Sequence, residues 1–255
     1  MIARPHAPTD TSAALDTLAG WLASARHVAV LTGAGMSTES GIPDFRSYQG
    51  RYTQNASLAE VLSIDYFLHN PAAFWEAFKE IFELKLTGDK QPNAGHRFLA
   101  WLAAQGKTVS VLTQNIDGLH QRAGSPQVLC LHGDLLRNRW LDLPCPHCDL
   151  ENTVDAHPPY CDACGNRVRP DVVWFGEPLP LAVLDAAQAA ARTCDLMLVV
   201  GTAGAVYPAA GLAHSARAAG ARVVVVNTAA SALDDVAHAV LRGTAAAVVP
   251  ALLGV

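Results

Sequence analysis

The sequence is poor in lysine and has no long apolar run, and each absence excludes a class of protein. Only four of its 255 residues are lysine, and 18 basic against 23 acidic residues give a net charge of −5. Because nucleic-acid-binding domains present clustered basic charge, this balance argues against a nucleic-acid partner. No apolar run reaches the roughly 18 residues of a membrane-spanning helix, so no membrane association is expected.

We also expect no secretion signal and find no internal repeats in the sequence. The first ten residues, MIARPHAPTD, lack the apolar stretch of a secretory signal peptide. No repeat and no low-complexity tract interrupts the chain. We therefore expect a cytoplasmic protein, in which cysteines stay reduced and a cluster of them favours a metal site.

What the sequence does contain is an alternation of strand-like and helical patterns. The strand-like runs, which are short, apolar and rich in β-branched residues, are 27–32, 109–113, 128–132, 171–175, 195–200 and 222–227. The helical patterns between them include 11–25, 93–105, 181–192 and 208–219. This alternation predicts an α/β fold with a parallel sheet covered by helices on both faces.

Two segments interrupt the alternation. Residues 47–91 show helical patterns without a strand pattern, including an apolar face around Phe78. Residues 138–169 are predicted to be irregular and contain four of the six cysteines. Both segments are therefore expected to lie outside the parallel sheet.

These four cysteines form two C-x-x-C pairs separated by twelve residues, Cys145 with Cys148 and Cys161 with Cys164. Two such turns can complete a tetrahedral zinc site. Disulfides or redox-active cysteines are the alternatives, and a reducing compartment disfavours them. Because all four ligands would be cysteine, no coordination position stays open for water, and the predicted zinc is structural.

The most specific segment is GAGMSTESGIPDFR at residues 33–46, directly after the first strand-like run. Gly33 and Gly35 can take backbone angles closed to other residues, and such a turn toward a helix presents N–H groups to phosphate. The segment departs from the common dinucleotide fingerprint, because Thr38 stands where the third glycine is usual. It therefore predicts a nucleotide site of a more specialised kind.

Polar motifs follow three of the strand-like runs. GAG follows the first run, QNID at 114–117 follows the second, and HGD at 132–134 follows the third. Ligands of parallel sheets bind at the carboxyl ends of the strands, so the three motifs are predicted to form one site. Histidine titrates near neutral pH, which makes His132 the natural general base of that site.

Together these motifs resemble those of the bacterial-type sirtuins, the NAD-dependent protein lysine deacylases. The resemblance rests, in order, on the segment 33–46, TQNIDGLHQRAG at 113–124, LHG at 131–133, the cysteine pairs, PDVVWFGE at 170–177, GTA at 201–203 and VVVN at 224–227. It extends from about residue 15 to the C-terminus, and both order and spacing agree.

The resemblance implies two domains. A Rossmann-like NAD-binding domain would comprise 1–46, 92–137 and 170–255, and a small domain would combine a helical module at 47–91 with a zinc-binding module at 138–169. It also implies that NAD, consumed as a co-substrate, meets acyl-lysine proteins or peptides between the domains.

The resemblance further assigns roles to single residues. His132 would accept a proton from the NAD ribose after the acyl oxygen attacks the anomeric carbon, with Asn115 as the second catalytic residue. The implied NAD contacts are Gly33, Ala34, Gly35, Asp44, Phe45, Arg46, Gln114, Asn115, Ile116, Asp117, Gly201, Thr202, Ala203 and Asn227. Two alternatives stay open, because Asp117 can instead cap a helix start and Asp44 can form a surface ion pair with Arg46.

Two of these NAD positions differ in how well they match the family. Phe45 resembles the ring that shields the reactive ribose from water, and core packing is its alternative role. The family usually has serine where this chain has Ala203. The missing hydroxyl donor is expected to weaken NAD binding by on the order of 1 kcal/mol.

The acceptor side of the site lies at the end of the PDVVWFGE segment. By resemblance, Val172 and Phe175 would line an acyl-lysine tunnel, and Gly176 and Glu177 would complete the stretch that pairs with an extended substrate peptide. The alternative for this stretch is a buried strand end, and Trp174 fits that alternative.

We therefore predict an NAD-dependent protein lysine deacetylase that transfers the acyl group to ADP-ribose and releases nicotinamide. Protein mono-ADP-ribosyl transfer, long-chain lysine deacylation and non-catalytic NAD binding are the alternatives. Sirtuins that prefer acidic acyl groups resemble one another in a Tyr and an Arg, three residues apart, in the helical module. Residues 74–90 contain neither, so neutral acyl groups are expected to be preferred.

Overall fold

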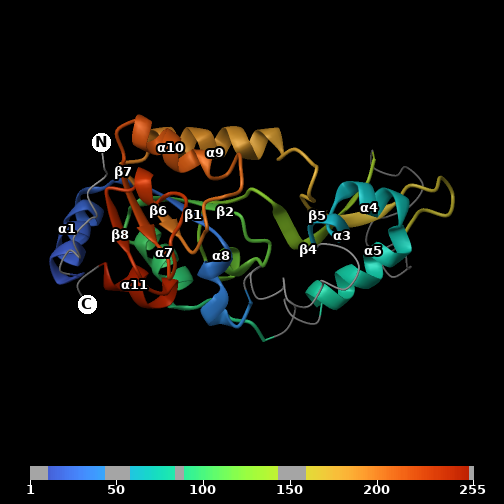
Figure 1. Ribbon diagram of the computed structural model, residues 1–255, viewed down its shortest axis with the longest axis horizontal. Helices are drawn as coiled ribbons and strands as arrows, with labels where there is room; N and C mark the ends of the chain where they lie inside the picture. The colour runs from blue at the N-terminus through green and yellow to red at the C-terminus, as the bar shows by residue number, and fades with distance from the viewer. Residues whose placement is uncertain (1–10, 44–57, 84–88, 143–158, 253–255) are drawn as a thin grey trace, which may run out of the picture.

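The computed structural model describes residues 11–43, 58–83, 89–142 and 159–252. Its large unit is built on a six-stranded parallel sheet with the strand order β3-β2-β1-β6-β7-β8 (Figure 1). The strands are β1 (His27–Thr32), β2 (Thr108–Thr113), β3 (Val128–Cys130), β6 (Leu196–Val200), β7 (Arg222–Val226) and β8 (Ala239–Leu241). The order reverses between β1 and β6, and sheets of this Rossmann-like kind bind ligands at the carboxyl ends beside that reversal.

Successive side chains of each strand enter two separate cores. Val28 and Val30 of β1 lie in the core beneath α1, α7 and α11, whereas Ala29 and Leu31 lie in the core beneath α9 and α10. The covering helices are α1 (Thr11–Ser24), α7 (Ala94–Ala104), α9 (Leu181–Thr193), α10 (Gly211–Ala218) and α11 (Ala245–Ala251). The predicted parallel sheet with helices on both faces is confirmed.

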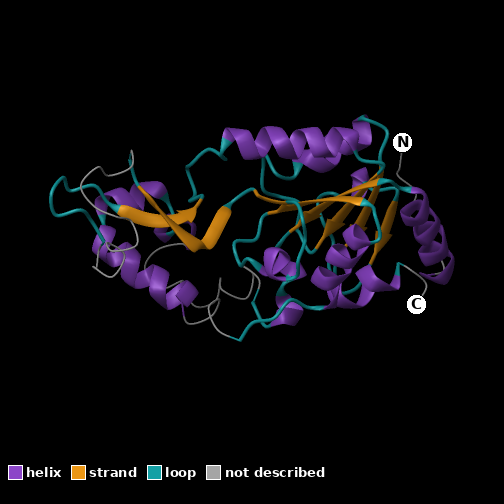
Figure 2. Ribbon diagram, turned by 180° about the vertical axis from the view of Figure 1, so that it is seen from behind, coloured by secondary structure: helices purple, strands orange, loops and turns teal. Residues whose placement is uncertain are grey.

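A smaller unit lies at the other end of the molecule (Figure 2). Its two strands, β4 (Gly133–Trp140) and β5 (Val168–Val172), are antiparallel, with an irregularity between Asp134 and Asn138. Its helical elements are α3 (Leu58–Val61), α4 (Ile64–His69), α5 (Pro71–Phe78) and the π-helical turn η3 (Lys79–Glu83). The helical patterns predicted within 47–91 are therefore present in its described part, 58–83.

Aromatic rings fill the core of this smaller unit. The Phe74 ring makes edge contacts with Phe67 and Trp174, with ring centroids 4.9 Å apart in both pairs. The helical residues buried with them are Trp75, Phe78, Ile81 and Phe82. The apolar face predicted around Phe78 is thus confirmed as core, and Trp174 is a buried residue.

The strand expected at 171–175 is wrong in position and in pairing. β5 begins and ends three residues earlier and pairs with β4, in a sheet separate from the parallel one. Beyond Val172 the chain turns, since Gly176 has a φ of +88° and the Glu177 N–H donates to the Trp174 carbonyl. Val172 and Trp174 of this stretch are therefore buried in the aromatic core of the smaller unit and do not pair in the large sheet.

The strand boundaries expected at 128–132 and the irregular structure expected at 138–169 are also partly wrong. The run 128–132 is a strand only as far as Cys130, and a new strand starts at Gly133. The ends of the segment 138–169, predicted to be irregular, belong to β4 and β5. Long-range pairing between these ends creates both strands.

Short elements complete the described chain. They are η1 (Ala34–Met36), η2 (Thr38–Ser40), α8 (Leu119–Arg122) and η4 (Asp234–Val236). Among the described residues, none of the helices has both the length and the hydropathy to cross a bilayer.

Candidate active site

The loops after β1 and β6 touch at the carboxyl edge of the large sheet. The Gly35 N–H donates to the carbonyl of Gly201 at 2.8 Å. A Cβ atom on Gly33 would lie 2.8 Å from the Cβ of Thr202, and one on Gly35 would lie 2.8 Å from the Cα of Gly201. Glycine is therefore required at 33 and 35 by the close approach of these two loops.

Hydrogen bonds connect the loop after β2 to both of these loops. Asn115 Nδ2 donates to the Gly33 carbonyl at 3.0 Å and lies 3.1 Å from the Ser37 hydroxyl. Gln114 Nε2 donates to Thr202 Oγ1 at 3.1 Å. Two of the three motifs predicted to share one site, GAG and QNID, are thus brought together at the strand ends.

Asp117 links the start of α8 to the loop after β1. Its Oδ1 accepts the Leu119 N–H at 2.9 Å, and its Oδ2 accepts the Ser37 hydroxyl at 2.7 Å. Burial raises the pKa of this carboxyl, and the two hydrogen bonds oppose that effect. Asp117 therefore accepts a main-chain N–H at the start of α8, although the N-cap itself is Gly118, and its contact with NAD stays a prediction.

His132 lies between β3 and β4, beside the loop after β2. Its Nδ1 is 3.0 Å from the carbonyl oxygen of Gln114. Because a carbonyl can only accept, Nδ1 carries the proton and Nε2 is the basic nitrogen of the neutral ring. Burial lowers the pKa of His132, against the smaller raising effect of the Gln114 bond. The ring is therefore neutral at pH 7 and suited to accept a proton.

A second pair of histidines is buried beneath the same loops. The rings of His96 and His120 have centroids 4.7 Å apart. His120 Nε2 lies 3.1 Å from Thr32 Oγ1, and His96 Nδ1 accepts the Asn93 N–H at 3.3 Å in the capping box of α7. Burial lowers the pKa of His96 to about 4 and that of His120 to about 3. The pair therefore stays neutral and supports the loops.

The segment after β5 presents one of the predicted substrate contacts at the surface. Phe175 is 48% exposed, and its main chain bonds to the small unit through Leu62 and Ile64. Val172 lies in the aromatic core. The contacts of Val172, Phe175 and Gly176 with a substrate stay predictions.

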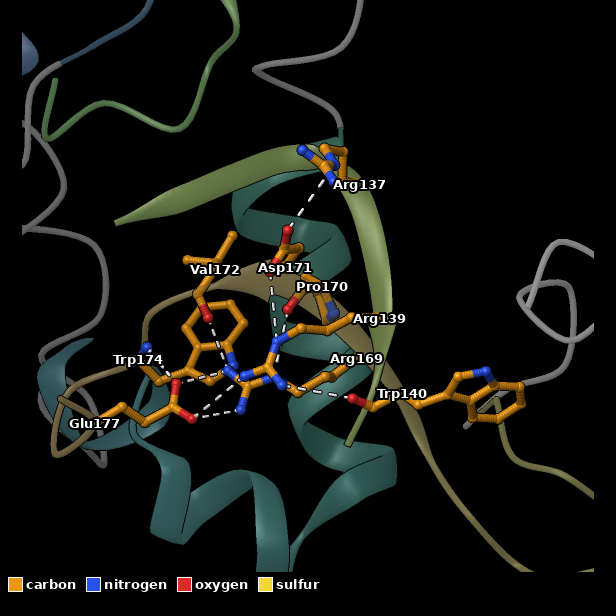
Figure 3. Close-up of polar contacts among 9 residues, drawn as sticks. All are labelled: Arg137, Arg139, Trp140, Arg169, Pro170, Asp171, Val172, Trp174 and Glu177. Carbon is orange, nitrogen blue, oxygen red and sulfur yellow. Dashed lines mark hydrogen bonds and ion pairs between the residues drawn. The ribbon is translucent and has the colours of Figure 1, made fainter. Parts of the chain in front are cut away.

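Both carboxylate oxygens of Glu177 are bonded to Arg169, a residue that sequence reasoning missed (Figure 3). The sequence showed only an arginine with an acidic residue eight positions later, a spacing that does not by itself predict a contact. His96 was also missed, although Asn93 followed three residues later by a polar side chain is a helix-capping pattern.

Those of the remaining predicted NAD residues that the structure describes lie on the same edge of the sheet. The Ile116 carbonyl accepts the Leu135 N–H at 2.9 Å, and Asn227 follows β7 with its Nδ2 bonded to the Ala229 carbonyl at 3.0 Å. Ala203 is exposed. Outside the described residues lie Asp44, Phe45, Arg46, Cys145 and Cys148.

The second predicted zinc pair lies in a tight turn. The Cys161 N–H donates to the Asn166 carbonyl at 2.8 Å, and the Gly165 N–H donates to the Cys161 carbonyl at 2.7 Å. Gly165 has a φ of +72°, which lets the chain fold back after Cys164. Among the described residues no group of three or more metal-binding side chains gathers. The turn and its two thiols fit half of a four-cysteine zinc site.

Comparison with known proteins gives matches along most of the chain. Residues 33–208 match the model of a family described as the Sir2 family. An "NAD-dependent protein deacetylase" of Chromobacterium violaceum is 52% identical over 203 residues, 80% of this chain and 82% of that protein. An "NAD-dependent protein deacylase" of Ralstonia nicotianae is 44% identical over 249 residues, 98% and 99% of the two chains.

Solved structures agree with these relatives. One described as "Structural Basis for the Mechanism and Regulation of Sir2 Enzymes" has a TM-score of 0.82 and 39% identity, and covers 95% of this chain and 97% of its own. Another, described as "Sir2-p53 peptide-NAD+", has a TM-score of 0.81 and 35% identity, and covers 94% and 97%. With a family model over 33–208 and relatives matched over four fifths or more of its length, the chain belongs to the Sir2 family, the sirtuins.

Proposed function

We propose that this protein is an NAD-dependent protein lysine deacetylase, which transfers the acyl group of acyl-lysine to ADP-ribose and releases nicotinamide. Relatives at 44% and 52% identity carry the names deacylase and deacetylase. Similar solved structures are described as "Sir2 bound to acetylated peptide" and "Structure of Sir2Tm bound to a propionylated peptide". In this chain the observation that carries the proposal is the neutral His132 with a basic Nε2 beside the converging loops.

In this proposal NAD is a substrate, and its glycosidic bond breaks as the acyl oxygen attacks the anomeric carbon. His132 Nε2 accepts the proton released by a ribose hydroxyl, and such a base contributes about 100- to 10,000-fold to a rate. The amide of Asn115, already bonded to Gly33 and Ser37, fixes the loops around that hydroxyl. The Ser37 hydroxyl also donates to Asp117, which ties the loop after β1 to the start of α8.

The NAD contacts are proposed from the position of the described residues at the sheet edge and, for Asp44, Phe45 and Arg46, from the sequence resemblance alone. They are Gly33, Ala34, Gly35, Asp44, Phe45, Arg46, Gln114, Asn115, Ile116, Asp117, Gly201, Thr202, Ala203 and Asn227. The close packing of the loops after β1 and β6 supports this set, because it lines up their main chains beside the strand ends.

We further propose one structural zinc ion held by Cys145, Cys148, Cys161 and Cys164. The tight turn at Cys161 supports it. The domains proposed are 1–46, 92–137 and 170–255 for NAD binding, and 47–91 with 138–169 for the small domain. The proposed location is cytoplasmic.

One incubation separates deacylation from its alternative. The protein is mixed with NAD and an acetyl-lysine peptide, and the masses of the peptide and of the protein are measured by mass spectrometry. Loss of the acetyl group together with formation of acylated ADP-ribose is expected. Gain of an ADP-ribosyl group on the peptide or on the protein, with the acetyl group intact, would instead favour mono-ADP-ribosyl transfer.

A further inference from the structure

A buried ion pair joins β5 to the turn that follows it (Figure 3). The Arg169 side chain is 1% exposed and that of Glu177 is 16% exposed. Arg169 donates to both carboxylate oxygens of Glu177, at 2.5 and 2.7 Å. A two-point contact of this kind is stronger and more directional than an ordinary hydrogen bond.

The same two side chains also hold the main chain of the turn. Arg169 Nη2 donates to the carbonyl oxygen of Val172 at 2.7 Å. Glu177 Oε2 accepts the N–H of Trp174 at 2.8 Å. The pair therefore fixes the beginning and the middle of the segment 172–177 from the inside of the protein.

Aromatic rings cover the guanidinium. The Cζ atom of Arg169 lies 5.7 Å from the ring centroids of both Phe67 and Trp174. These rings shield the Arg169 guanidinium from water, and a buried charge without its partner is strongly unfavourable. Arg169 and Glu177 therefore act as one unit.

The turn held by this pair connects the two halves of the proposed site. The Val173 N–H donates to the carbonyl of His132 at 2.9 Å. Two residues later, the main chain of Phe175 bonds to Leu62 and Ile64 of the small unit. A shift of the turn would therefore move the exposed Phe175 ring relative to His132.

From this geometry we infer that Arg169 and Glu177 are positioning residues for the acyl-lysine substrate. The pair preforms the turn 172–177, so that a peptide binds without having to order it first. Glu177 then acts through Arg169 and Trp174, in place of the direct substrate contact expected from the sequence. The inference rests on the proposed function and deepens it.

The first test compares wild type with Glu177→Gln on one acetyl-lysine peptide. Glutamine keeps the size of the side chain but removes its charge and one acceptor oxygen. The KM for the peptide is expected to rise at least about tenfold, because charge-assisted bonds that hold the turn are lost. The KM for NAD and kcat are expected to change less than about threefold, since the loops of the large sheet are untouched.

A second variant covers the case in which Glu177→Gln is poorly folded. Arg169→Met combined with Glu177→Leu replaces the pair by apolar side chains of similar size and leaves no unpaired buried charge. This double variant should fold and still show the raised peptide KM, because the Val172 carbonyl and the Trp174 N–H have lost their partners.

Asp195→Asn is the matched control for a general loss of stability. The Asp195 carboxylate accepts the Arg26 and His27 N–H groups at 2.8 and 2.9 Å, at the amino end of β1. Its loss should lower the melting temperature and leave the peptide KM unchanged.

The possible outcomes distinguish a failure of the proposed function from a failure of the positioning role. If wild type does not deacylate the peptide, the proposed function fails and the positioning role fails with it. If wild type is active and both variants keep a peptide KM within about threefold of wild type, the positioning role alone is overturned. An equal rise in the KM values for NAD and peptide would also overturn it, because that pattern indicates damage to the whole site.

Discussion

The Nδ1 atom of His132 lies 3.0 Å from the carbonyl oxygen of Gln114, which leaves Nε2 as the basic atom of the ring. If this atom is the general base, His132→Ala should lower deacylation about 100- to 10,000-fold. NAD affinity should stay within a few-fold, since the loops that surround the ring keep their own bonds. His214→Ala, an exposed substitution on α10, is the control. A His132→Ala protein with more than a tenth of wild-type turnover would contradict the assignment.

The pH dependence of the reaction tests the same group. Burial lowers the pKa of His132 from its ordinary 6.5, so the ring stays neutral to a lower pH than a free histidine. The acid limb of kcat/KM should therefore lie below pH 6.5, with activity full above it and lost as the pH falls through the lowered pKa. A limb centred above 6.5 would mean that another group controls the rate.

The large sheet could be predicted because both of its faces are buried. Val28 to Leu31 are apolar at every position, since alternate side chains enter different cores. That pattern locates strands, and the strands locate the site, because polar motifs must follow their carboxyl ends. The contact between His132 and the loop after β2 follows from the same logic.

The small unit could not be predicted as well, because its order comes from long-range contacts. The strand β4 has little apolar alternation, with Leu136 exposed, and it forms through pairing with β5. Arginine side chains are usually exposed, and Arg169 is buried because Glu177, the Val172 carbonyl and two aromatic rings contact it. No spacing rule connects such partners.

The proposed zinc site can be tested by replacing its cysteine ligands. Cys164→Ser, and equally Cys145→Ser, should lose a bound zinc ion and lower the melting temperature, since a structural zinc contributes folding energy directly. Cys130→Ser is the control, because Cys130 accepts a bond from Gln121 and belongs to neither pair. Elemental analysis that finds no zinc in purified, active wild type would rule the site out.

The buried pair His96 and His120 should make the protein sensitive to acid. An unfolded histidine titrates at about 6.5, whereas burial lowers the pKa of His96 to about 4 and that of His120 to about 3. The unfolded state therefore takes up more protons as the pH falls, and stability that is full above pH 6.5 is lost between 6.5 and about 4. The loss is on the order of 3 kcal/mol for each histidine at pH 4.

Urea unfolding at pH 7 and pH 4 measures this loss. His96→Gln should reduce the difference in unfolding free energy between the two pH values, and the exposed His214→Gln should leave it unchanged. An equal difference in both variants would show that other groups cause the acid sensitivity.

We predict an acyl preference from the aromatic core beside the proposed substrate turn. Residues 74–90 contain no Tyr and no Arg, and Phe74 and Phe78 pack against Trp174 instead. The cation buried among these rings, Arg169, is engaged by both oxygens of Glu177. A succinyl carboxylate entering here would have to lose water without gaining that cation, at a cost of several kcal/mol.

Acetyl-lysine should therefore be preferred over succinyl-lysine and malonyl-lysine. The measurement is kcat/KM on one peptide sequence that carries an acetyl, a succinyl or a myristoyl group on the same lysine. Because a neutral alkyl chain brings no charge into the aromatic core, myristoyl turnover is compatible with the argument and would only show a deeper tunnel. Succinyl turnover equal to or above acetyl turnover would contradict it, since the carboxylate would then have a partner other than the paired Arg169.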